Sequence, residues 1–204
     1  YYVRAARLYL AAENIQKDRR FFPKLGRLYA DWANDIMESP KPDHAGSYID
    51  TACQYMDSML LCRDLWKKFA QKTHPKTKFE KYLSEENAEA LHGYGDFFFE
   101  VNDRDMAFHL YEKAENKLHD QETLKRLYDL SSDLKKPFDF QRFLHSGNAY
   151  ELGLYGDFFF EKEKWEEARQ LYEKAENINH STTILLNLLS IAANTGQPLD
   201  FQRC

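Results

Sequence analysis

The chain has 204 residues, of which 43% are hydrophobic and 30% charged, a composition that excludes an intrinsically disordered protein. No apolar run approaches the ~20 residues that cross a bilayer, so no membrane partner is expected; the formal net charge is -5 and no basic stripe is present, which argues against nucleic acid. The three cysteines, Cys53, Cys62 and Cys204, form no disulfide framework. They favour a reducing compartment and predict a cytoplasmic protein.

Residues 1–25 predict the second helix of an incomplete repeat unit. Leu8-Tyr9 and the Ala-Glu-Asn triplet at 12–14 recur with the same spacing at 110–116. The first helix of this unit is absent or lies upstream. Because the chain does not begin with Met and stops within its last unit, we also expect it to be a piece of a longer protein.

Residues 26–87 predict a divergent repeat unit made of two helix pairs. The first pair has small or apolar residues at a spacing that recurs later in the chain. The second pair begins with a helix at 61–72, continues through a turn at Pro75 and ends in a short helix. The recurring residues of the first pair are Ala33, Ala45, Ile49 and Ala52, and those of the short helix are Phe79, Tyr82 and Leu83.

Residues 88–148 form the clearest unit, which begins with two helices. A helical run at 88–100 is followed by a polar turn at 102–103. The next run places apolar residues three, four and seven positions apart, which puts them on one face of a helix. These residues are Ala107, Leu110, Tyr111 and Ala114.

The same unit continues with a less regular second pair. A helix is predicted at 122–134, then a turn at Pro137, then a short helix that contains Phe140, Phe143 and Leu144. The short helices of the two units match each other. Each unit is therefore expected to contain one standard and one shortened helix pair.

Residues 149–204 repeat the preceding unit with a shift of 61 residues. About 26 of some 57 aligned residues are identical without a gap, and a match of this length at one period indicates a repeat architecture. This last unit is truncated at the C-terminus. The identical stretches lie at 95–100 and 156–161, at 110–116 and 171–177, and at 139–142 and 200–203.

The spacing of Gly95, Ala107, Tyr111 and Ala114 resembles the tetratricopeptide repeat, and it recurs 61 residues later. A small residue lets two antiparallel helices approach closely, and we expect the tyrosine ring to fill the space between neighbouring helix pairs. The resemblance implies that residues 1–204 form one all-α solenoid of antiparallel helix hairpins. Such an array winds as a right-handed superhelix in which each unit contacts mainly its neighbours.

No motif for catalysis is visible. The seven histidines contain no HExxH and no H-x3-H pair, and the cysteines contain no CxxC. Gly93, Gly95, Gly153 and Gly156 fall within predicted helices rather than in a phosphate-binding loop. We therefore predict no enzyme activity, no catalytic residue, no metal site and no cofactor.

The resemblance implies a binding surface, because the first helices of the hairpins line a concave groove in this family. In this register the groove is acidic and aromatic. The alternative for the Phe triplets at 97–99 and 158–160 is that all three rings lie in the core. The predicted groove residues are Asn34, Met37, Glu38, His92, Asp96, Phe99, Glu100, Asp157, Phe160 and Glu161.

These residues predict a protein–protein interaction scaffold. Asp96 and Asp157 stand where chaperone-binding members of the family use basic or amide side chains, so we expect a peptide with Lys or Arg beside apolar residues rather than an acidic tail. Two alternatives stay open. The chain is a regulatory arm of a larger ATPase or protease, or it self-associates through an apolar solenoid end formed by Ile184, Leu185, Leu188 and Leu189.

Overall fold

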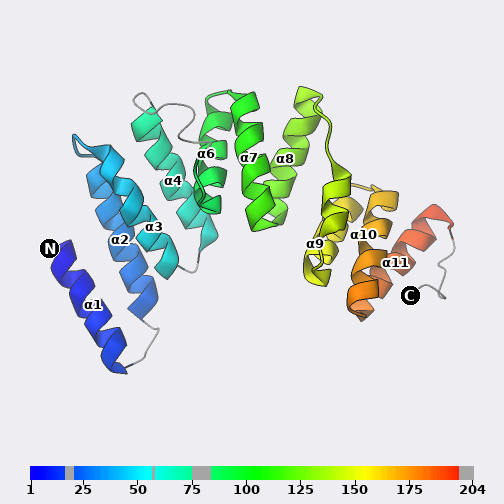
Figure 1. Ribbon diagram of the computed structural model, residues 1–204, viewed down its shortest axis with the longest axis horizontal. Coiled ribbons are helices and arrows are strands. Elements are labelled where there is room, and N and C mark those ends of the chain that lie inside the picture. The colour runs from blue at the N-terminus through cyan, green and yellow to red at the C-terminus, as the bar shows by residue number, and fades with distance from the viewer. Residues whose placement is uncertain (17–20, 57, 75–83, 198–204) are drawn as a thin grey trace. The chain divides into compact units, whose positions relative to one another are not determined.

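The computed structural model describes residues 1–16, 21–56, 58–74 and 84–197, with the side chains of all of these except 12–16. Regular structure in these ranges is helical and includes no strand (Figure 1), which confirms the all-α prediction. The α-helices are α1 (Tyr2–Gln16), α2 (Phe22–Met37), α3 (Gly46–Tyr55), α4 (Met59–Thr73), α6 (Ala88–Glu100), α7 (Arg104–Leu118), α8 (Gln121–Leu134), α9 (Ala149–Glu161), α10 (Trp165–Ile178) and α11 (Thr182–Thr195). Two short 3-10 helices are η2 (Pro42–Ala45) and η4 (Phe140–His145).

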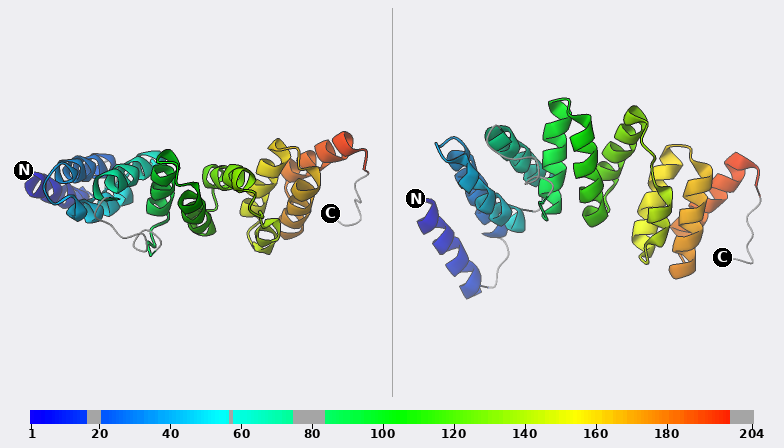
Figure 2. Two further views of the ribbon diagram at one scale, coloured as in Figure 1. Left: turned by 90° about the horizontal axis from the view of Figure 1, so that it is seen from above. Right: turned by 45° about the horizontal axis from the view of Figure 1, so that its top comes forward.

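The helices group into two compact units, Tyr1–Leu118 and His119–Cys204. In the first unit α2 packs on α3, α4 on α6 and α6 on α7; in the second, α9 packs on α10 and α10 on α11 (Figure 2). The boundary falls between α7 and α8, inside the unit predicted at 88–148. Contact between helices that follow one another in sequence is thus the rule within each unit.

The helices α6 and α9 begin and end in the same way. Asn87 and Asn148 cap their first turns by accepting hydrogen bonds from backbone N–H groups, which satisfies donors that the helix leaves free. Asn102 and Glu163 follow the two helices with positive φ, 63° and 56°, the conformation that ends many helices. The polar turn predicted at 102–103 is therefore confirmed, and so is its counterpart at 163–164, where the 61-residue repeat places it.

The tyrosines of α7 and α10 pack against glycines of the preceding helix. A Cβ atom placed on Gly95 would lie 2.7 Å from Cε1 of Tyr111, and one on Gly156 would lie 2.6 Å from Cε1 of Tyr172. The ring therefore rests on the glycine of its own helix pair. The Tyr172 hydroxyl also accepts a hydrogen bond from Asn187 of α11, at 3.1 Å.

The Phe triplets are divided between core and surface. Phe158 and Phe159 are buried in the core of the second unit, whereas Phe160 is half-buried and packs edge-on against Trp165 at 5.1 Å between ring centroids. Phe97, Phe98 and Phe99 follow the same pattern. The alternative that all three rings lie in the core is therefore wrong, because successive residues on a helix point about 100° apart.

The remaining elements meet the predictions unevenly. The short helix around Phe140 is the 3-10 helix η4, but Pro75, Phe79, Tyr82 and Leu83 lie outside the described residues, as do 198–204 and the side chains of 12–14. At the predicted apolar end, Leu188 is buried, which corrects its placement on an open face, whereas Ile184 and Leu185 are half-buried. Leu189 is exposed.

Candidate functional site

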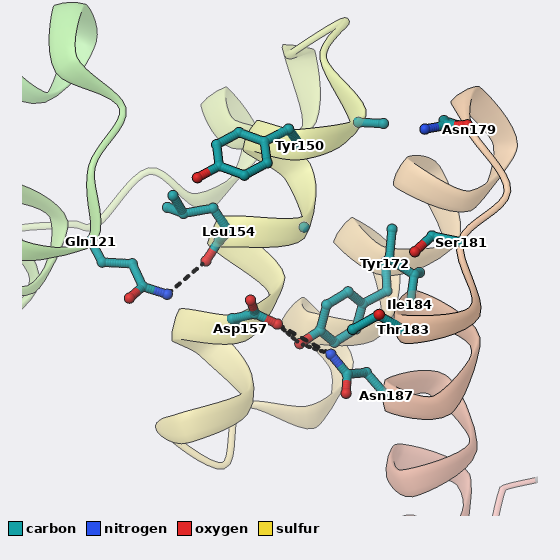
Figure 3. Close-up of a pocket in the computed structure, with 12 residues that line it drawn as sticks. Gln121, Tyr150, Leu154, Asp157, Tyr172, Asn179, Ser181, Thr183, Ile184 and Asn187 are labelled. Atoms are coloured by element: carbon teal, nitrogen blue, oxygen red, sulfur yellow. Dashed lines mark hydrogen bonds between the residues drawn. The ribbon is translucent and has the colours of Figure 1, made fainter.

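The second unit contains a pocket of about 560 Å³ between α9, α10 and α11 (Figure 3). Its walls combine apolar side chains, two tyrosines and several hydroxyl and amide groups. Among the lining residues only Asp157 carries a formal charge at neutral pH. The lining residues are Gln121, Ala149, Tyr150, Gly153, Leu154, Asp157, Tyr172, Asn179, Ser181, Thr183, Ile184 and Asn187.

Asp157 is held in place by a three-residue hydrogen-bond network. Its Oδ1 atom accepts hydrogen bonds from the Tyr172 hydroxyl at 2.6 Å and from Nδ2 of Asn187 at 3.2 Å, and the same Asn187 nitrogen lies 3.1 Å from the tyrosine oxygen (Figure 3). Within the described part of the chain, no hydrogen bond or ion pair is made by Oδ2. One carboxylate oxygen is thus fixed while the other stays available to a ligand.

Burial of the ring is the main reason why the pKa of Tyr172 is raised well above its ordinary value near 10, and the hydrogen bond to Asp157 adds to it. Both effects disfavour the phenolate, since it would be poorly solvated and would lie beside a carboxylate. Tyr172 therefore stays a hydrogen-bond donor to Asp157 throughout the physiological pH range.

Stability is expected to fall as pH rises above about 10, because the unfolded chain then releases the Tyr172 proton that the folded chain keeps. The expected slope for this one group is about 1.4 kcal/mol per pH unit. Urea unfolding of the parent and of Tyr172→Phe at a series of pH values measures it. Tyr150→Phe is the matched control, because Tyr150 is exposed and should retain the parent slope. A Tyr172→Phe variant with the parent slope would contradict the prediction.

The two repeat-equivalent aspartates have different surroundings. Asp96 accepts a hydrogen bond from the Tyr111 hydroxyl at 2.5 Å through Oδ1, while its Oδ2 lies 3.6 Å from Nε2 of His92, and its side chain is only 23% exposed. Asp157 is exposed. Both oxygens of Asp96 thus face groups of its own unit, whereas Asp157 presents one oxygen to the pocket.

Position 153 contributes to the depth of the pocket. It is equivalent to His92, whose buried ring lies edge-on to Tyr111 with 5.3 Å between centroids. At Gly153 no ring is present, and a Cβ atom placed there would meet nothing closer than Cδ1 of Ile184 at 4.0 Å. The glycine leaves open, beside Tyr172, the space that a histidine fills beside Tyr111.

Of the predicted groove residues, only Asp157 lines this pocket. Met37 and His92 are buried, so they do not face an open groove, and the prediction is wrong for them. Glu38 and Glu100 are exposed, but they pair with Lys72 and Lys67 at 2.7 and 2.6 Å.

The remaining predicted residues lie elsewhere on the two units. Asn34 and Phe99 are half-buried in the first unit, and Phe160 is half-buried in the second. Glu161 lines a separate hollow of about 510 Å³ with Glu122, Lys125 and Lys162. None of these four residues lines the pocket around Asp157.

Sequence reasoning missed the pocket residues Asn179, which follows α10, and Asn187 of α11. Asn179 stands where the preceding repeat has Leu118. This departure from the repeat was the available signal, since a position that is apolar in the preceding repeat has become polar. The glycine at 153 gave the same signal.

Among the described residues, no group of three His, Cys, Asp or Glu side chains is placed to hold a metal ion. No helix in these ranges is both long and apolar enough to span a bilayer. No protein-family model matches the sequence, and no curated protein matches it significantly. The residues of the pocket are therefore the basis for inferring function.

Proposed function

We propose that this chain is part of a tetratricopeptide-type α-solenoid that binds a peptide segment of a partner protein in the pocket around Asp157. The preferred segment carries a Lys or Arg side chain next to apolar residues. One observation supports this above all: the exposed carboxylate of Asp157 lies among apolar and aromatic walls with its Oδ2 atom not engaged by the described protein. The superhelical winding of the solenoid is part of the same proposal.

Charge and size both favour such a ligand. A cation placed beside the Oδ2 atom of Asp157 gains a charge-assisted hydrogen bond, which is roughly twice as strong as a neutral one. Ala149, Leu154 and Ile184 offer apolar surface to the rest of the segment. The volume of about 560 Å³ lies within the usual range for ligand pockets and exceeds what one side chain needs.

Filling the pocket at position 153 is expected to weaken this binding. Random peptides displayed on phage and selected on the parent should be enriched in Lys or Arg with neighbouring apolar residues. The affinity of a selected peptide should fall about tenfold or more in Gly153→His, because the new ring occupies the space beside Tyr172 that is open in the parent. Fluorescence anisotropy of the labelled peptide measures the dissociation constant.

Gly147→His provides the matched control. It adds the same side chain to an exposed glycine that does not line the pocket, and its affinity should equal that of the parent. Selected peptides without basic residues, or equal affinities for both histidine variants, would refute the proposed site.

A further inference from the structure

Three consecutive large apolar side chains are exposed at the beginning of α4. Met59, Leu60 and Leu61 are 54%, 63% and 51% exposed. The next turn of the same helix turns inward, since Cys62, Leu65 and Trp66 are buried. These three residues therefore do not contribute to the part of the core that α4 packs in the first unit.

The equivalent positions in the other repeats are polar. With the 61-residue shift, the buried Trp66 and Phe69 of α4 correspond to the buried Leu127 and Leu130 of α8, which supports this alignment of the two helices. The triplet 59–61 then corresponds to Asp120, Gln121 and Glu122, and one repeat later to Ser181, Thr182 and Thr183. The helix does not need apolar residues at these positions, and an apolar run that stays in water indicates an interaction surface.

A pocket of about 360 Å³ adjoins this run and carries positive charge. Leu61 and Met56 form part of its apolar wall, and Lys24 and Arg27 of α2 are exposed at its edge. Within the described residues, neither cation has an ion-pair partner, and Pro23 and Ser58 complete a lining without a carboxylate. In a protein of net charge -5, this surface has the opposite sign from the pocket around Asp157.

We propose that the surface formed by Met59, Leu60, Leu61, Lys24 and Arg27 docks an acidic peptide segment of a second partner protein, with Asp or Glu beside Leu, Ile or Phe. The carboxylates face Lys24 and Arg27, and one apolar side chain enters the pocket beside Met56. A concave pocket that accepts a side chain favours a peptide over a bilayer, because the surface of a bilayer has no side chain that could enter the pocket. This partner is distinct from the basic segment proposed for the second unit.

The test is a selection of displayed random peptides on the whole chain, followed by affinity measurement on variants. Enriched peptides should include a class with acidic and apolar residues together. Its affinity should fall about tenfold or more in Lys24→Glu/Arg27→Glu, and also in Leu60→Gln/Leu61→Glu, which introduces the residues of the next repeat. Asp157→Asn is the control and should leave this affinity unchanged.

Lys24→Glu/Arg27→Glu tests whether the basic residues bind the peptide, and Leu60→Gln/Leu61→Glu tests whether the apolar residues do. Helicity measured by circular dichroism checks that each variant is folded. If the α4 variant does not fold, the α2 variant alone still tests the charge requirement. Failure to enrich acidic peptides, or affinity that neither variant reduces, would overturn the proposal. So would binding to phosphatidylserine vesicles that the same variants abolish, because the surface would then serve an anionic bilayer.

Discussion

Replacing Tyr172 by alanine is expected to lower the free energy of unfolding by about 3–5 kcal/mol, the usual cost of truncating a large buried aromatic residue. The side chain is fully buried and rests on Gly156, so a substantial cavity is left between α9 and α10. The change also removes the hydroxyl that donates to Asp157. Urea unfolding followed by circular dichroism at neutral pH measures the difference.

Tyr172→Phe separates the ring from its hydroxyl. It keeps the packing against Gly156 and loses the hydrogen bonds of the hydroxyl to Asp157 and Asn187, so a loss of about 0.5–1.5 kcal/mol is expected for each bond. If the alanine variant were no less stable than the phenylalanine variant, the ring would not support the helix pair, and the interpretation of the Gly–Tyr spacing would be wrong.

Gly156→Ala and Gly153→Ala, both in α9, are expected to change stability in opposite directions. A methyl group on Gly156 lies 2.6 Å from the Tyr172 ring, so ring and helix must move apart, at about 1–3 kcal/mol. The same methyl on Gly153 is in ordinary contact distance of Ile184. There alanine should stabilise the helix by about 0.5–1 kcal/mol, because glycine is the poorer helix former.

The two glycine variants are controls for each other, since they add the same atom to the same helix. Thermal unfolding of both, beside the parent, should place one melting temperature below the parent and the other above it. Destabilisation of equal size at both positions would show that the close approach of Tyr172 is not specific to Gly156.

Much of the helical framework could be predicted from the sequence. The predicted bounds 88–100 agree with α6, and the same span shifted by 61 residues, 149–161, agrees with α9, because the repeat shows the same helix twice and the polar turns mark its end. The packing of Tyr111 and Tyr172 against a glycine of the preceding helix was predicted only in part. The spacing of the repeat identifies the glycine as the small residue between two helices, but it does not show which aromatic ring contacts it.

The difference between Asp96 and Asp157 could not be predicted, although the two occupy equivalent positions. Whether a carboxylate oxygen is available depends on the side chains around it: His92 lies beside one aspartate, whereas Gly153 leaves the other open. Their equivalent positions in the repeat predict that both aspartates are groove residues. Met37 was misplaced as well, since it is the last residue of α2 and is buried.

The most direct measurement is the dissociation constant of one selected basic peptide for the parent, Asp157→Asn and Asp96→Asn. Both variants remove one charge and keep an oxygen that accepts from the tyrosine hydroxyl, so folding should be similarly preserved. Asp157→Asn is predicted to weaken binding by about tenfold or more, and Asp96→Asn to leave it unchanged. Equal affinity of the parent and Asp157→Asn, or a loss confined to Asp96→Asn, would contradict a binding site centred on Asp157.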